Sequence, residues 1–333
     1  MALALAAVMA VSMVACVGEK AKTYKTGMGI NTKVSKQFDA KDGNNGKVEL
    51  STTIVIASFD QDGKVVSATI DVAQQSADID ATGKIVSETD LRTKVEKGDD
   101  YGMKKYAGAV AEIDEQYASL EKWMVGKTVD EIVNMEVYAK DEKHTSVPAV
   151  EDLKSSVTID VAAYLEGLKE AWDTATETTG PVAKTGLGTV ISSKEVDAGE
   201  NDGLFQIDTN IVGVAFDAEG KIVWAGIDTA QQAAKFTATG AFTGEIDCRT
   251  KVDKGTDYKM KEYAGAVAEI DEQYASLAKW MLGKTVDEVV NMEVYARDEK
   301  HTAVPAVEDL KSSVTITVGE QLEALAKAAK NSK

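Results

Sequence analysis

Two segments of the chain carry residues that serine enzymes use for catalysis. Ser119 stands three residues before Lys122, and Ser276 stands three residues before Lys279, which is the S-x-x-K spacing of penicillin-interactive serine enzymes. Lys25-Thr26-Gly27 matches their K-T-G element. In those enzymes the K-T-G element comes late and an S-D-N element precedes it, whereas here K-T-G comes first and S-D-N is missing. We therefore interpret these residues as polar positions of ordinary helices and strands.

Histidines and carboxylates supply no clear acid and base pair. His144 and His301 each lie among Glu, Lys and Thr, which is typical of a solvated loop. Acidic pairs such as Asp114-Glu115 fall at helical spacing beside apolar residues, so we expect solvated helix faces. Gly27 and Gly29 lack the third glycine and the preceding strand of a dinucleotide-binding turn. These residues leave an enzymatic role uncertain, because they supply no nucleophile with a matching base.

Composition limits the remaining chemistry. The 333 residues include 55 acidic and 37 basic side chains, a formal charge of −18, which argues against binding to nucleic acid or to an anionic lipid surface. With Cys16, Cys248, two histidines and no C-x-x-C, the chain has too few ligands for c-type haem, an iron–sulfur cluster or a thiolate zinc site. We expect no metal site, and any redox chemistry requires an organic cofactor.

One repeated segment resembles the acceptor motif for covalent flavinylation, in which an Asp stands six residues before a Thr or Ser. Asp152-Leu-Lys-Ser-Ser-Val-Thr158 recurs as Asp309-Leu-Lys-Ser-Ser-Val-Thr315. An anionic Asp can order a loop by accepting backbone N–H groups, and apolar neighbours on both sides turn the threonine hydroxyl outward. A β-branched residue at a strand end, before the last helix, explains the same pattern. Small serines leave room beside each hydroxyl: Ser155, Ser156, Ser312 and Ser313.

The elements that must position these threonines also occur twice. Residues 106–159 recur at 263–316 with five substitutions, of which only Glu121 to Ala278 is not mild. The predicted fold class is α+β, with two tandem homologous domains that each pack an antiparallel sheet with helices. The predicted boundaries are a signal peptide at 1–15, a tether at 16–24, a first repeat at 25–173, a flexible Thr-rich linker at 174–183 and a second repeat at 184–333.

Hydrophobic periodicity outlines each repeat. Alternation at 48–56 and 66–72 around Asp62-Gly63 predicts a hairpin, and an apolar stripe from Val110 to Met124 predicts a helix. Capping boxes at 128–131 and 317–320 predict two further helix starts. A last helix is expected to turn four side chains inward: Tyr164, Leu165, Leu168 and Trp172.

The N-terminal segment indicates export. Residues 2–15 form an uncharged apolar run, too short to span a bilayer, that ends on small residues before Cys16. Met13-Val14-Ala15-Cys16 resembles a bacterial lipobox, with Met in place of the usual Leu. We expect lipidation at Cys16, anchoring at the extracellular face of the cell membrane, and a translation start further upstream, since no Lys or Arg precedes the apolar run. Cys248 is then expected to be a lone buried thiol.

Several segments together resemble one family. GDDYGMKKYAG at 98–108, AQQ after a strand, W-M-x-G-K-T-x-D-E at 123–131 and the terminal SSVTI are similar to flavin-carrying lipoproteins of Gram-positive extracellular electron transfer, the PplA type with FMN-binding domains. The resemblance covers nearly the whole mature chain. It implies FMN esterified through phosphate to Thr158 and Thr315 by a separate flavin transferase. It also implies residues that contact the flavin ring: Lys94, Lys251, Tyr101, Tyr258, Met103, Met260, and Tyr106 with its copy.

The function implied by this resemblance is electron transport. A surface-anchored flavoprotein would pass electrons from membrane quinol-linked donors to extracellular acceptors such as ferric iron. With a flexible linker, the flavin at Thr158 would receive electrons first and the flavin at Thr315 would pass them on. The alternative is a cofactor-free solute-binding or adhesive surface lipoprotein.

Overall fold

Each repeat forms a four-stranded antiparallel sheet with helices on one face. The chain is described by a computed structural model that covers residues 22–333, so Cys16 and the signal segment lie outside the described residues. No helix within 22–333 is long and apolar enough to cross a membrane. The α+β class with antiparallel sheets is confirmed.

The two repeats share one order of elements except for two short strands, since β6 follows the last helix of the first repeat only and β10 follows the third strand of the second repeat only. The first contains β1 (Lys25–Phe38), β2 (Gly46–Phe59), β3 (Val65–Ile79), α1 (Lys94–Lys97), η1 (Gly98–Tyr101), α2 (Met103–Ala107), α3 (Ile113–Met124), α4 (Val129–Val133), β4 (Val137–Tyr138), β5 (Val147–Pro148), α5 (Ala162–Asp173) and β6 (Thr176–Glu177). The second contains β7 (Lys184–Val196), β8 (Gly203–Phe216), β9 (Ile222–Phe236), β10 (Phe242–Thr243), α6 (Lys251–Lys254), η2 (Gly255–Tyr258), α7 (Met260–Ala264), α8 (Ile270–Met281), α9 (Val286–Val290), β11 (Val294–Tyr295), β12 (Val304–Pro305) and α10 (Gly319–Lys330). The main sheets have the orders β3-β2-β1-β6 and β10-β9-β8-β7.

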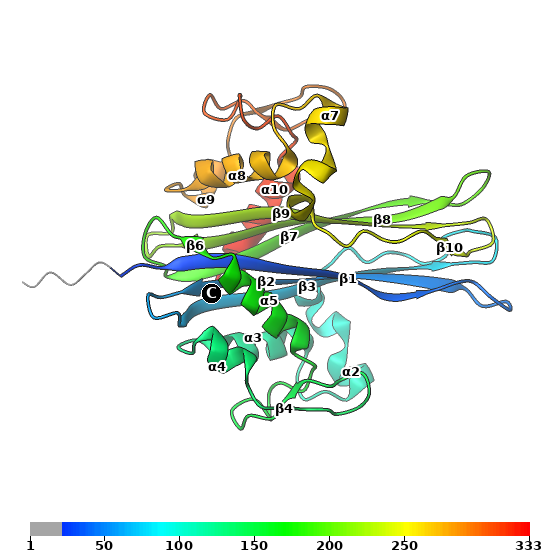
Figure 1. Ribbon diagram of the computed structural model, residues 1–333, viewed down its shortest axis with the longest axis horizontal. Helices are drawn as coiled ribbons and strands as arrows, with labels where there is room; N and C mark the ends of the chain where they lie inside the picture. The colour runs from blue at the N-terminus through cyan, green and yellow to red at the C-terminus, as the bar shows by residue number, and fades with distance from the viewer. Residues whose placement is uncertain (1–21) are drawn as a thin grey trace, which may run out of the picture.

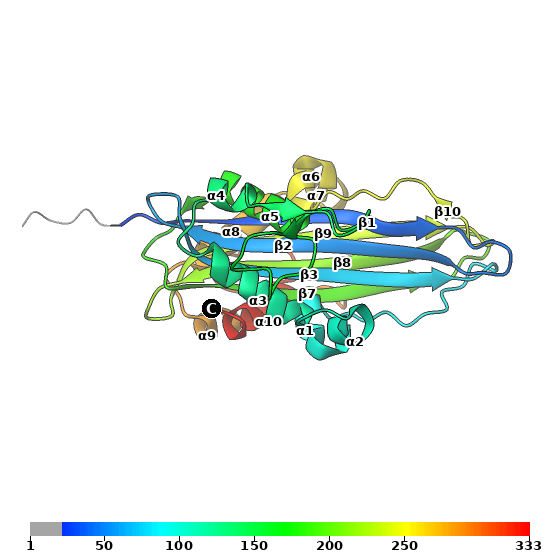
Figure 2. The ribbon, with the colours of Figure 1, turned by 90° about the horizontal axis from the view of Figure 1, so that it is seen from below.

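The two sheets pack face to face, and the helices cover their outer faces (Figures 1 and 2). In β2, Val55 and Ala57 belong to the core beneath the helices, whereas Ile54 and Ile56 pack against Leu187 and other residues of the second repeat. A second inter-sheet cluster includes Phe205 and Phe236. Because the middle strands are buried on both faces, alternate side chains build two different cores.

The predicted flexible linker is instead packed against both repeats. Thr176 and Glu177 pair with β1, and the Thr179 N–H donates to the Val223 carbonyl at 2.9 Å. Val182 is buried. The expectation that 174–183 lets the second repeat swing is therefore wrong, because backbone hydrogen bonds and a shared inter-sheet core hold the segment.

The predicted hairpin turn and the first of the two predicted capping boxes are confirmed. Gly63 turns the hairpin between β2 and β3 with a φ of 74°, and Thr128 caps α4 in the predicted capping box with Glu131. The box at 317–320 is wrong, because α10 begins at Gly319 with no side-chain cap. Val110 precedes α3 and is 55% exposed, and Trp172 is 38% exposed at the end of α5, so neither belongs to the inward stripe.

The paired glycines of β1 allow a helix to lie directly on the strand. A Cβ atom at Gly27 or Gly29 would overlap the carbonyl oxygens of Ala171 or Gly167 in α5. Gly186 and Gly188 of β7 meet α10 in the same way. The G-x-G spacing therefore serves helix–strand packing, as close backbone approach requires.

We predict that Gly29→Ala lowers the free energy of unfolding by about 2 to 3 kcal/mol, because α5 must move away from β1 to admit the methyl group. Gly199→Ala is the matched control, since a Cβ atom there meets no atom within 4 Å. Urea denaturation of both variants measures the difference. Equal stability of the two variants would show that the close packing is not required.

Candidate functional site

Thr158 follows a helical turn that holds the modification segment. The turn spans 151–156. The Val157 N–H, directly after it, donates to the Leu153 carbonyl at 2.8 Å, and the side chains of Val157 and Leu153 are buried. Thr158 is half-buried and Ile159 is buried. The predicted alternation around Thr158 is present, although 157–159 is not a strand.

A buried glutamine fixes the threonine backbone in both repeats. The Thr158 N–H donates to Gln116 Oε1 at 2.8 Å, and Gln116 Nε2 donates to the Ala111 carbonyl at 2.8 Å. Gln273 holds Thr315 in the same way at 2.8 Å. Each threonine hydroxyl lies 3.5 Å from the same amide oxygen, at the limit of hydrogen bonding, so it is only weakly engaged. Sequence reasoning missed this glutamine, which looks like a polar position on an amphipathic helix.

The two predicted aspartates do not order the turn. Asp152 and Asp309 are exposed, and their side chains make no hydrogen bond within residues 22–333. Backbone N–H groups of the turn are already satisfied by carbonyls such as that of Val150. Ser155 and Ser312 are also exposed, as a modification segment requires, and Ser156 and Ser313 are half-buried. The loop-ordering role expected for the aspartates is therefore wrong.

A cation lies beside the second threonine. Arg297 Nη1 donates to the Thr315 carbonyl at 3.0 Å. The equivalent residue in the first repeat is Lys140. His301, from the same loop, is partly exposed and its Nδ1 lies within hydrogen-bond distance of Asp298, at 2.7 Å, so the histidine has a local partner. A guanidinium at this position can neutralise a phosphate that is esterified to the threonine.

The remaining predicted residues form one lysine–tyrosine pair in each repeat. Lys94 Nζ lies 5.2 Å from the centre of the Tyr101 ring, and Lys251 Nζ lies 5.3 Å from that of Tyr258. Met103 and Met260 are half-buried next to these pairs in the chain, whereas Tyr106 is 75% exposed. Within the described part of the chain, no hydrogen bond joins these side chains to either threonine. The structure therefore supports the pairs but does not bring them into contact with the attachment positions.

A buried aspartate on the edge strand β3 was also missed. Asp71 of β3 accepts the Val72 and Val95 N–H groups at 2.7 and 3.1 Å, which ties α1 to the strand. Burial, the largest influence, raises the pKa of Asp71 to about 7, although these bonds and the Thr93 hydroxyl lower it. Asp228 is its copy, and burial raises the pKa there to about 6. The repeated I-D-x-A-Q-Q was the sequence feature that could have identified both.

These aspartates predict a stability that falls as the pH rises. The folded pKa of Asp71, about 7, lies above its ordinary value of 3.8, so its stabilising contribution is complete below pH 4 and is lost as the pH approaches 7. Between pH 4 and 7, Asp71 should lower the free energy of unfolding by on the order of 3 kcal/mol, and Asp71→Asn should remove this decrease. Urea denaturation across this range measures it, with exposed Asp99→Asn as the control of equal charge. An unchanged slope in Asp71→Asn would contradict the assignment.

Comparison with known protein families, with curated proteins and with solved structures found no match to this chain. The function must therefore be argued from the residues and the geometry described above.

Proposed function

We propose that this protein is a surface-anchored electron carrier with FMN attached covalently to Thr158 and Thr315. The observation that carries the proposal is the equivalent presentation of the two threonines. In each repeat a buried glutamine fixes the threonine N–H at 2.8 Å, while the adjoining serine is exposed. A modifying enzyme can reach such a hydroxyl without unfolding the domain.

The residues present fit an esterified FMN phosphate. Arg297 places a positive charge beside Thr315, and Lys140 is the equivalent residue of the first repeat. Each threonine is held mainly through its backbone N–H, and its hydroxyl makes only a weak hydrogen bond. The hydroxyl oxygen is therefore available to form a phosphoester. Bound FMN supplies the reversible electron transfer, and the protein supplies position and charge. The Lys94–Tyr101 and Lys251–Tyr258 pairs are the proposed contacts of the ring.

The two attachment segments lie on opposite outer sides of the sandwich (Figure 1). Thr158 is held by Gln116 of α3 and Thr315 by Gln273 of α8, so each threonine lies at its own helical layer with both sheets between them. Adjacent layers are about 10 Å apart, so the threonines are separated by roughly 30 Å. This separation does not favour the expected relay from Thr158 to Thr315, and we propose that each flavin exchanges electrons with its own partner.

The proposed partners follow from this role. A flavin transferase attaches the cofactor, a membrane quinol-linked donor reduces it, and an extracellular acceptor such as ferric iron oxidises it. Lipidation at Cys16 would hold the protein at the extracellular face of the membrane. The formal charge of −18 disfavours nucleic acid as a partner.

We predict one FMN adduct per repeat in protein produced with a flavin transferase. Thr158→Ala and Thr315→Ala should each remove one adduct by intact mass, and the double variant should lose in-gel flavin fluorescence, because no other Ser or Thr N–H within 22–333 is held by a buried glutamine. Thr→Ser at both positions is the matched control and should keep the flavin. A wild type without flavin would contradict the function, and an adduct elsewhere would contradict the site.

Asp152 should matter for modification and not for folding. Because its side chain is exposed and free of hydrogen bonds within 22–333, Asp152→Asn should change the unfolding free energy by less than about 0.5 kcal/mol. Loss of flavin from the first repeat alone is expected, since the transferase must recognise an accessible acid. Full loading of Asp152→Asn would show that this carboxylate is not part of the recognition signal.

A further inference from the structure

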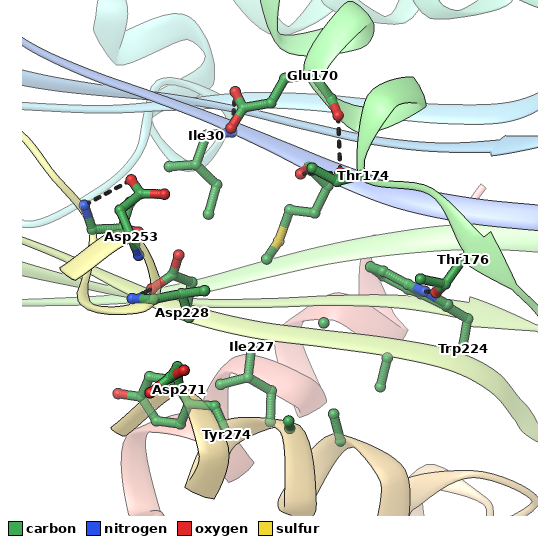
Figure 3. A pocket seen from close by; sticks show the side chains of 17 residues that line it. Ile30, Glu170, Thr174, Thr176, Trp224, Ile227, Asp228, Asp253, Asp271 and Tyr274 are labelled. Carbon is green, nitrogen blue, oxygen red and sulfur yellow. Dashed lines mark hydrogen bonds between the residues drawn. The ribbon is translucent and has the colours of Figure 1, made fainter. Parts of the chain in front are cut away.

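A cavity of about 310 Å³ lies between the two repeats (Figure 3). Its walls come from β1 and α5 of the first repeat and from β9, α6 and α8 of the second. Met28, Ile30 and Ile227 give it an apolar side, and Trp224 and Tyr274 add aromatic rings. A volume of roughly 300 Å³ is the lower end of the range for small-molecule sites.

Four carboxylates line this cavity, and no Lys, Arg or His does so. Glu170 extends from α5 toward Asp228, Asp253 and Asp271 of the second repeat (Figure 3). Glu170 accepts the Ile30 N–H at 3.1 Å. Asp271 Oδ1 is buried and makes no hydrogen bond within 22–333. No side chain that lines the cavity therefore carries a positive charge to pair with these carboxylates.

In the equivalent cleft on the other side of the molecule, lysine side chains form ion pairs with the carboxylates. There Lys327, the copy of Glu170, pairs with Glu96 at 2.8 Å. Lys333 places its Nζ 2.6 Å from Glu121, while its backbone pairs with Thr185. The chain's own lysines thus supply ammonium groups and aliphatic stems on that side.

The substitutions between the repeats remove those lysines from the cavity. Glu170 replaces Lys327, and Thr176 stands at the position of Lys333. Thr176 instead accepts the Trp224 Nε1–H at 2.9 Å, which fixes the indole at the wall. Ala278 replaces Glu121, which enlarges the space. The cavity is therefore the counterpart of a lysine-filled cleft: Asp253 stands at the position of Glu96, whereas Glu121 and both lysines are replaced.

We infer that this cavity binds an organic cation, a primary ammonium group on an aliphatic stem. The ammonium takes the place of a lysine Nζ between Glu170 and Asp253, and the stem lies against Met28 and Ile227. Trp224 and Tyr274 offer aromatic rings to the same ligand, as organic-cation sites commonly do. The inference does not depend on the flavin.

Two further observations agree with this ligand. Burial, and then the nearby carboxylates of Asp253, Glu166 and Asp228, raise the pKa of Glu170 to about 7, as expected for an acid that lacks a counter-charge. No group of three or more His, Cys, Asp and Glu side chains in the described range is arranged to hold a metal ion. The carboxylates surround a cavity rather than a single point, which suits an organic cation better than a metal.

The test is calorimetric titration of the full chain with pentylammonium chloride at pH 8, with pentan-1-ol as the neutral analogue. We expect saturable binding of the amine and at least about tenfold weaker binding of the alcohol, because the charge is what the carboxylates recognise. Failure of the folded wild type to bind the amine would overturn the inference. So would equal binding of the alcohol.

Substitutions at Glu170, including the lysine found in the equivalent cleft, test where the amine binds. Glu170→Lys should pair with Asp253 and abolish amine binding, and Glu170→Gln should weaken it at least about tenfold. Glu142→Gln changes the charge equally on the exposed loop between β4 and β5, away from the cavity, and should bind like the wild type. If Glu170→Lys fails to fold, Glu170→Gln decides the matter. Equal binding by Glu170→Gln and Glu142→Gln would place the amine elsewhere and overturn the assignment.

Discussion

The face-to-face packing of the two sheets is the interaction on which the rest of the structure depends. Phe205, Phe236 and Ile54 are fully buried between the sheets, and each such side chain contributes roughly 1.5 to 3 kcal/mol. The packing leaves only the outer faces for helices. Each repeat must therefore place its helices, its glutamine and its threonine on the side away from the other repeat. One sandwich, with Thr158 and Thr315 held in separate helical layers, follows from this arrangement.

The duplication is used symmetrically at the outer faces and asymmetrically between the repeats. Gln116 and Gln273 hold their threonines at the same distance, which is expected where nearly identical segments face outward. Between the repeats, by contrast, side chains of one repeat contact residues of the other repeat whose sequence has diverged. A Lys327–Glu96 ion pair on one side corresponds to Glu170 beside Asp253 on the other. Divergence after duplication can thus create a cavity without altering either fold.

The sequence predicts the local elements better than their assembly. The hairpin at Gly63 and the cap at Thr128 depend on neighbouring residues, so a local pattern specifies them. The inter-sheet core could not be predicted in this way, because alternation in a strand does not say what covers its second face. The paired glycines were considered as a nucleotide-binding turn and act in helix packing. At the candidate site, the two threonines stay a prediction from the repeated motif, whereas Gln116 and Asp71 derive their importance from burial, which only tertiary structure shows.

Fragment mapping of the native protein by tandem mass spectrometry tests the central claim most directly. The protein would be purified from cells that contain a flavin transferase, and its peptides would be sequenced without enrichment for flavin. The account predicts an FMN phosphoester on residue 158 in one peptide and on residue 315 in another, with neither serine of the adjoining pair modified. Unmodified peptides at both positions, in cells whose transferase modifies other proteins, would contradict it.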